Sequence, residues 1–450
     1  MVEDRIENRN RPSLSRQLLP AVHGMLARPL SSYYLLIASA GLLLLIGLTM
    51  VFSATSVRAY AEQGSAFSAV RNQAFSAGLG LLGFWVCQRL PARTLRLLGT
   101  WLLGVSIVLL TILDLLVTLG KLGLLDEKNP TIGPVHAYLL WLYLGPIQVQ
   151  PSELVKIGLA LWGADLIARK GASLGWWREL SMPLFPVVGL LFVLVGYNDT
   201  GSMLVLLAIV VGLLWAAGVR MRVFGALGVM GLAGIGLLIA AASRGAGSGS
   251  ADEPNYRFAR ITNWLNPPVD CRLDDCYQML QSRSAIHEGG WFGVGLGKSA
   301  LKWDWLPAAN NDFIFAIVAE ELGVVGCFVV LVLFAVLAYS GFRIARRVDD
   351  PFRRLAATAI ITWIVTQAVI NIGGVTGLIP LTGVPLPFIS DGGSALVVTL
   401  AATGMLASFA RAEPDAARAL NARPPARWVR LVWAPLPPIP PPRRSRDGRG

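Results

Sequence analysis

Apolar segments recur along the whole chain and are separated by short polar breaks. A helix needs roughly 20 apolar residues to cross the hydrocarbon core of a bilayer, and about ten segments approach that length. The fifth and sixth are separated only by the polar stretch Asn198-Asp199-Thr200-Gly201. The pattern predicts an all-α polytopic membrane protein with about ten transmembrane helices. The predicted spans lie at about residues 33–55, 68–88, 97–118, 151–168, 181–197, 201–218, 223–243, 322–341, 356–378 and 392–410.

The composition supports this prediction and excludes several other classes of protein. Hydrophobic residues make up 54% of the chain and charged residues only 15%, and the mean hydropathy is +0.58. Soluble domains carry about a quarter charged residues. A soluble fold has too little interior to bury so much apolar surface, so lipid is expected to cover it. A secreted disulfide scaffold, a disordered protein and a nucleic-acid-binding globule are excluded.

Basic residues predict the orientation of the spans, because Lys and Arg favour the cytoplasmic loops. They cluster in alternate loops, which puts both termini in the cytoplasm and the long loop between spans seven and eight, 244–321, outside. The net charge of +12 then reflects topology and attraction to anionic lipid, and no nucleic-acid partner is expected. The basic clusters are the N-terminal segment from Arg5 to Arg28, then 89–96, 169–178, 220–222, 343–354 and the segment from Arg411.

The same pattern divides the chain into three parts. Residues 1–32 are predicted to be a cytoplasmic N-terminal tail, residues 33–411 the transmembrane domain, and residues 412–450 a cytoplasmic tail rich in Pro and Arg. A Pro-rich segment of this kind is expected to be extended and solvated.

The chain has four cysteines and three histidines. Cys87 and Cys327 lie in or near spans, where cysteine acts as a small apolar residue. Cys271 and Cys276 lie in the long outer loop, where a disulfide is plausible. A metal pair there lacks further His or Cys ligands nearby, and the chain holds no zinc motif such as H-E-x-x-H.

Charged residues at the edges of spans are candidates for function, because they are costly in a membrane. Glu153 and Lys156 stand three residues apart at the outer start of the fourth span, so they can pair on one helix face. They form either an ion pair that makes burial tolerable or the charged wall of a water-filled cavity. Asp199 is predicted to cap the helix that follows it.

The densest polar region covers residues 277–321 and includes Asp312. Its glycines favour a bent backbone at the membrane surface over a nucleotide-binding loop, since no strand precedes them. The apolar run 313–319 follows Asp312, and a carboxylate in apolar surroundings suits a general base near neutral pH. Capping of the next helix explains the Asn311-Asp312 pair equally well. The last outer loop, 371–394, is apolar and Pro-rich, and is predicted to lie on or dip into the membrane surface.

Four sequence blocks resemble the SEDS family of peptidoglycan polymerases, which includes FtsW and RodA. They read "QPSELVKIGLAL" from Gln150, "DTGSMLVL" from Asp199, "QSRSAIHEGGWFGVGLGKSALKWDWLPAANNDFIFAIVAEELG" from Gln281, and "NIGGVTGLIPLTGVPLPFISDGGS" from Asn371. The resemblance covers about residues 33–411. The segments "MVFSATSV" from Met50 and "KWDWLP" with "NDFIFA" are more similar to the division members of the family than to the elongation members. The outer loop around His136 departs from the family pattern, because the family's arginine is absent there.

The resemblance implies that the chain polymerises lipid II on the outer face of the cytoplasmic membrane. The reaction inverts the donor sugar, and undecaprenyl pyrophosphate leaves. The family's essential aspartate falls on Asp312, as general base or as ligand of a divalent cation such as Mg or Mn. Candidates for binding substrate or pyrophosphate, or for lining the cavity, are Glu153, Lys156, Arg257, Arg260, Gln281, Arg283, Lys298, Lys302 and Ser390.

The family also implies partners and a location. A class B penicillin-binding-protein transpeptidase, other divisome membrane proteins and the lipid bilayer are the expected partners, and the division septum is the expected location. A lipid II flippase, an elongation polymerase and a divisome scaffold are the alternatives. Flipping predicts polar groups through the whole depth of the bundle. The polar blocks of this sequence cluster at the outer side, which favours the enzyme.

Overall fold

The computed structural model describes most of the chain between residues 28 and 439. The described residues are Gly24 and 28–64, 67–126, 129–138, 140–145, 147–171, 177–222, 224–225, 228–229, 264–265, 275–303, 305–306 and 308–439. Arg257, Arg260 and Cys271 therefore lie outside the described residues, as does most of the predicted seventh span.

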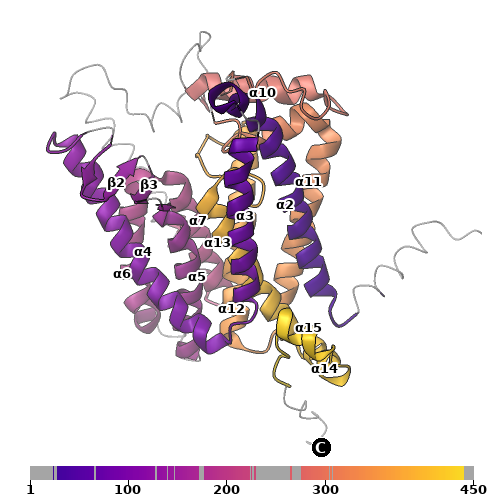
Figure 1. Ribbon diagram of the computed structural model, residues 1–450. Coiled ribbons are helices and arrows are strands. Elements are labelled where there is room, and N and C mark those ends of the chain that lie inside the picture. The colour runs from indigo at the N-terminus through magenta and orange to yellow at the C-terminus, as the bar shows by residue number, and fades with distance from the viewer. Residues whose placement is uncertain are drawn as a thin grey trace, which may run out of the picture.

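Long helices form a bundle, which Figure 1 shows with the N-terminal helices in indigo and purple. Each of the other nine predicted spans falls largely within one of these helices. In the described part of the chain, five helices (α2, α4, α11, α12 and α13) are long and apolar enough to cross a membrane. The helices are α2 (Ser31–Gln63), α3 (Phe67–Cys87), α4 (Ala92–Lys121), α5 (Pro151–Lys170), α6 (Trp177–Asn198), α7 (Thr200–Ala216), α10 (Asp275–Gly289), α11 (Ile314–Arg347), α12 (Pro351–Val375) and α13 (Gly393–Arg411).

A small antiparallel sheet precedes α5, so the prediction of an all-α protein is wrong for this outer loop. Its four strands pair in the order β1-β2-β3-β4. Ala137 and Leu142 are buried against leucines of α4. Aromatic and β-branched residues favour strands, and Gly133 and Gly145 supply tight turns. The strands are β1 (Thr131–Ile132), β2 (Val135–Tyr138), β3 (Trp141–Leu144) and β4 (Ile147–Val149).

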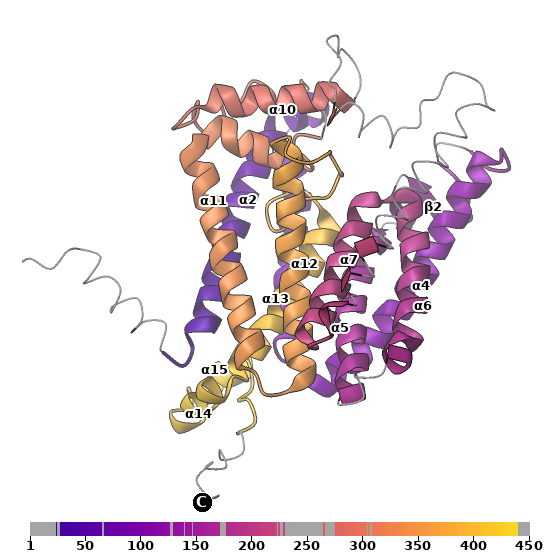
Figure 2. The same cartoon turned by 180° about the vertical axis from the view of Figure 1, so that it is seen from behind.

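The two ends of the bundle differ in character. At one end, Arg96 of α4 lies 3.6 Å from Asp165 of α5 and 3.4 Å from Asp350, which caps α12. This ion-pair network gathers three of the basic loops at one end. Helix α10 lies across the opposite end, at the top of Figure 2. The predicted orientation, in which the basic loops are cytoplasmic, stays a prediction.

Part of the C-terminal segment is fastened to the bundle, so the expectation of an extended, solvated tail is wrong there. It forms α14 (Pro414–Ala422) and α15 (Arg427–Val432), which lie at the end opposite α10 (Figure 2). Side chains at the ends of α3 and α13 donate hydrogen bonds to successive backbone carbonyls of residues 431–435. The bonds run from Arg89 to Leu431, from Trp85 and Arg89 to Val432, from Gln88 to Trp433, and from Arg411 to Ala434 and Pro435.

Candidate functional site

Asp312 lines a narrow cavity at the end of the bundle that carries α10. Helix α11 begins at Ile314 with Phe313 as its N-cap, so Asp312 stands one residue before the capping position. The cavity has a volume of about 20 Å³, room for about one water-sized group. The lining residues come from α10, the segment just before α11, α12 and the loop that follows α12. They are Gln278, Asp312, Phe313, Ile370, Asn371, Gly374, Val375, Leu381, Thr382, Gly383 and Val384.

Asn371 of α12 joins the two segments that face each other across this cavity. Its Nδ2 donates a hydrogen bond to the backbone oxygen of Asp312 at 2.9 Å and another to that of Val384 at 2.8 Å. Gly383 adopts a φ of +71°, and a Cβ built there would lie 3.8 Å from Asp312 Oδ2. Glycine therefore suits the left-handed backbone at this position, and the distance places residue 383 beside the Asp312 carboxylate.

A second set of hydrogen bonds fixes the same loop against residues 310–311. Ser390 Oγ donates to the backbone oxygen of Asn311 at 2.6 Å and accepts from Leu386 N at 2.7 Å. Asn310 Nδ2 donates to Asp391 Oδ2 at 2.9 Å. Burial raises the pKa of Asp391, and the hydrogen bond from Asn310 offsets part of that rise. Ser390 thus holds the loop that lines the Asp312 cavity.

Glu153 and Lys156 form a fully buried ion pair in the first turns of α5. The Lys156 ammonium lies 2.6 Å from Glu153 Oε1, and both side chains are 0% exposed. Lys156 also donates to Gln367 Oε1 at 3.1 Å, and Gln367 Nε2 donates to the backbone oxygen of Pro385 at 2.9 Å. The ion pair therefore connects to the loop that lines the Asp312 cavity. Nearby, Asp199 caps α7 through a 2.8 Å bond from Ser202 N, which confirms its predicted capping role.

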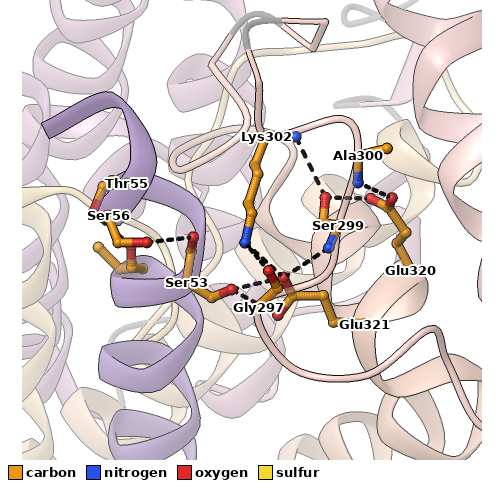
Figure 3. Close-up of polar contacts among 10 residues, drawn as sticks. Ser53, Thr55, Ser56, Gly297, Ser299, Ala300, Lys302, Glu320 and Glu321 are labelled. Carbon is orange, nitrogen blue, oxygen red and sulfur yellow. Dashed lines mark hydrogen bonds and ion pairs between the residues drawn. The ribbon is translucent and has the colours of Figure 1, made fainter. Parts of the chain in front are cut away.

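Lys302 lies in a different polar cluster, between α2 and α11 (Figure 3). Its ammonium lies 3.7 Å from Glu321 Oε1 and donates to the backbone oxygen of Gly297. Ser53 Oγ of α2 donates to the same Glu321 carboxylate at 2.6 Å. Glu320 accepts from Ser299 Oγ and from Ala300 N, the latter at 2.7 Å. Lys302 is buried and engaged with these groups.

A break in α11 presents the two glutamates to this loop. Gly323 has a φ of +66° inside the helix, and the segment after α10 crosses the chain there. Val294 N donates to the backbone oxygen of Glu320 at 2.9 Å, and Val324 N donates to that of Gly290 at 2.9 Å. Lys302 stays a candidate from the sequence for the substrate or its pyrophosphate, but the sequence analysis did not foresee its ion pair with Glu321. The signal in the sequence is the pair Glu320-Glu321 directly after the apolar run 313–319, because buried carboxylates need partners.

Glu321→Gln tests how strongly this cluster holds the loop. We expect a loss of about 1–3 kcal/mol in the free energy of unfolding, because a buried carboxylate that accepts several hydrogen bonds is lost. Thermal unfolding of the purified protein in micelles measures the change. Glu288→Gln, on the exposed face of α10, removes the same charge and serves as control. Equal unfolding midpoints for the two variants would contradict a stabilising role for the cluster.

The remaining predicted site residues take varied positions. Arg283 is exposed on α10, and its guanidinium lies against Gly377 in the loop after α12. Gln281 is half-buried on α10, and Lys298 is exposed on the following loop. Cys276 lies in α10, but its side chain is outside the described residues. The structure thus places Asp312 next to the loop that carries Ser390. Lys302 lies in a separate cluster.

The cavity residues were compared with what a divalent cation requires. Mg²⁺ and Mn²⁺ favour several oxygen ligands with carboxylates among them. Asp312 is the one carboxylate among the cavity-lining residues, and the described part of the chain contains no group of three His, Cys, Asp or Glu side chains suited to a metal. These residues do not form an all-protein cation site, although one carboxylate can hold Mg²⁺ together with substrate phosphates. A single carboxylate also suits proton transfer.

The chain was compared with known families and proteins. A family model described as cell cycle protein, covering FtsW, RodA and SpoVE, matches residues 33–414. A Mycobacterium tuberculosis protein named "Probable peptidoglycan glycosyltransferase FtsW" is 41% identical over 93% of this chain and 75% of its own length. The stage V sporulation protein E of Bacillus subtilis is 34% identical over 86% of this chain and 99% of its own length.

Solved structures give the same picture. A chain from a peptidoglycan synthase complex, described as coordinating polymerization and crosslinking, superposes with a TM-score of 0.61 at 27% identity. That match covers 84% of this chain and 96% of the other. The rod shape determining protein RodA of Thermus thermophilus superposes with a TM-score of 0.56 at 25% identity, again over 84% and 96%. The resemblance predicted from the four sequence blocks is confirmed.

Proposed function

Because this chain belongs to the FtsW/RodA/SpoVE family of cell cycle proteins, we propose that it is a multi-pass membrane peptidoglycan glycosyltransferase of the cell-division type. It polymerises lipid II at the outer face of the cytoplasmic membrane. The names of its relatives support the activity and the division role. The observation that carries the proposal is the position of Asp312 in a cavity at the α10 end of the bundle.

In the proposed reaction, Asp312 acts as the general base. It removes the proton from the 4-hydroxyl of the acceptor N-acetylglucosamine as that oxygen attacks the anomeric carbon of the donor. The new C–O bond forms while the bond to undecaprenyl pyrophosphate breaks, so the configuration inverts and the proton ends on the Asp312 carboxylate. The cavity admits a hydroxyl-sized group next to this carboxylate, which supports the assignment.

The leaving pyrophosphate needs cations near its growing charge. Arg283 and Lys298 are exposed at the α10 end, which supports them as candidates, and Arg257 and Arg260 stay candidates from the sequence. Lys302 is better suited to shaping the loop, because its ammonium is already engaged with Glu321. Glu153 and Lys156 support the cavity wall through Gln367.

The proposed partner is a class B penicillin-binding-protein transpeptidase, with other divisome membrane proteins at the septum. The similarity to a chain from a complex that coordinates polymerization and crosslinking supports it. The test is incubation of purified lipid II with this protein and that transpeptidase, inactivated at its own nucleophile. Glycan strands are expected from the pair. Their absence, together with transport of lipid II across proteoliposomes, would replace the polymerase with a flippase.

Asn371→Leu is expected to lower kcat by about 10- to 100-fold. The substitution removes both hydrogen bonds that hold Asp312 against Val384, and a small displacement of a catalytic group is costly. Asn421→Leu is the matched control, because Asn421 Nδ2 also donates to two backbone carbonyls, those of Ala417 and Pro437, at the opposite end. Initial rates of polymerisation over a range of lipid II concentrations measure the effect. Similar kcat values for both variants would contradict the positioning role.

Cys271 and Cys276 are predicted to form a disulfide in the oxidised protein. Cys276 lies in the first turn of α10, close in sequence to the cavity residue Gln278, so the bond would tie the preceding loop to that helix. Mass spectrometry after alkylation of the denatured, non-reduced protein tests it. Cys87 and Cys327, which are free in the structure, act as internal controls that become alkylated. Alkylation of all four thiols would refute the disulfide.

A further inference from the structure

The end of the bundle opposite α10 carries a band of aromatic and basic side chains, most of them exposed, here called the basic–aromatic band. Trp428 of α15 is 69% exposed and Tyr34 of α2 is 63% exposed. Trp85 of α3 and Trp433, just after α15, are also exposed. Arg423 and Arg427 are exposed and Arg430 is half-buried in the same C-terminal segment as Trp428. The members of the basic–aromatic band are Tyr34, Trp85, Arg423, Arg427, Trp428, Arg430 and Trp433.

The band is held rigidly against the ends of the transmembrane helices. Five successive backbone carbonyls, from Leu431 to Pro435, accept hydrogen bonds from side chains at the end of α3, in the two residues that follow it and at the end of α13. Trp433 Nε1 donates to the Tyr33 hydroxyl at the start of α2. With its backbone fixed in this way, the segment presents Leu431 and Val432, 72% and 60% exposed, to its surroundings.

The exposed apolar surface continues onto faces of the bundle that are expected to contact lipid. Leu81, Leu82 and Val86 of α3 are exposed along the same helix as Trp85. Aromatic residues gather where membrane helices meet water, because their rings are apolar at one end and polar at the other. The composition of the band is thus typical of the boundary where the headgroups of one leaflet begin.

The positive charge of the band favours lipids with anionic headgroups. Among the described residues, no ion pair engages Arg423, Arg427 or Arg430. In the described part of the segment the two acidic residues are occupied elsewhere. Asp415 pairs with Arg418 at 2.7 Å, and the buried Glu413 lies 3.8 Å from Arg347. The exposed guanidinium groups of Arg423 and Arg427 and the half-buried one of Arg430, together with the exposed Trp428 and Leu431 side chains, complement a surface that is anionic outside and apolar beneath.

We propose that the basic–aromatic band binds anionic phospholipid headgroups of the inner leaflet, with Arg423, Arg427 and Arg430 on the phosphates and Trp428 and Leu431 at the acyl boundary. The C-terminal segment is then an interfacial anchor fastened to α2, α3 and α13. This inference uses the membrane-spanning fold and does not depend on the chemistry at Asp312.

The test measures lipid binding by the full-length protein in detergent micelles. Native mass spectrometry is run with added dioleoylphosphatidylglycerol or dioleoylphosphatidylcholine, for the wild-type protein and for the triple variant Arg423→Gln/Arg427→Gln/Arg430→Gln. Each basic residue near an anionic surface contributes about fivefold in affinity. We therefore expect phosphatidylglycerol binding to weaken by roughly 100-fold in the triple variant, with phosphatidylcholine binding unchanged.

Arg418→Gln is the matched control, because its guanidinium is paired with Asp415, and it should keep wild-type phosphatidylglycerol binding. Raising the salt concentration to about 0.5 M should reduce the wild-type preference for phosphatidylglycerol, because screening weakens contacts between exposed charges. Equal binding of the two lipids by the wild-type protein, or undiminished phosphatidylglycerol binding by the triple variant, would overturn the proposal. An acidic protein would then be the better occupant of the band.

Discussion

Asp312→Asn is expected to lower the rate of glycan polymerisation by about 10²- to 10⁴-fold, the usual contribution of a general base. The amide has the size and shape of the carboxylate but does not accept the proton of the attacking hydroxyl. The backbone oxygen that Asn371 binds is unchanged, so the fold and the cavity should persist. Single-turnover polymerisation of lipid II measures the loss without a contribution from product release.

Asp391→Asn is the matched control for this experiment. Asp391 belongs to the same loop cluster, where Asn310 Nδ2 donates to its carboxylate, and its replacement removes one carboxylate without touching the proposed base. We expect the Asp391 variant to keep most of its activity. A rate for Asp312→Asn that matches the rate for Asp391→Asn would show that Asp312 acts only through local structure.

Lys156→Met is expected to destabilise the protein by about 3–5 kcal/mol, the largest stability change foreseen for a single substitution in this chain. The Glu153 carboxylate is 0% exposed and would be left in the interior without its cation. Gln367 Oε1 would also lose one of its two donors, while the bond from Trp363 Nε1 would remain. Denaturant unfolding in mixed micelles measures the free energy of unfolding.

The double variant Glu153→Gln/Lys156→Met separates charge burial from packing. Removing both charges together should recover much of the stability, because a neutral pair of similar volume costs little to bury. Lys298→Met, at an exposed position, controls for the loss of a lysine as such. A double variant no more stable than Lys156→Met would show that the ion pair itself, and not the avoidance of a lone charge, stabilises the bundle.

Most helices of the bundle could be predicted from the apolar segments of the sequence, because a helix that crosses the hydrocarbon core needs roughly 20 apolar residues. The sheet at 131–149 was missed because its strands are two to four residues long, too short to show an alternating pattern. The docking of residues 431–435 was missed for another reason. It depends on donors from α3 and α13, more than 20 residues away in sequence in each case, and the Pro-rich composition alone favours an extended chain.

The candidate site was predictable in part. The apolar run after Asp312 and the family resemblance both singled out this residue, and the structure places it in a cavity. Lys302 is a candidate for the pyrophosphate on its charge alone, because the sequence does not show its partner Glu321. Glu321 meets it only through the break in α11 at Gly323. Asn371 was overlooked because an amide in an apolar helix gives no sign of the two backbone carbonyls that it bridges.

The most direct measurement is gel electrophoresis of the glycan made from purified lipid II by the protein with its transpeptidase partner, inactivated at the transpeptidase nucleophile. Long strands from the wild-type protein and none from Asp312→Asn, at equal protein levels and equal partner binding, are the predicted result. Strands of the same length and yield from Asp312→Asn would contradict the assignment of Asp312 as the base of a peptidoglycan polymerase.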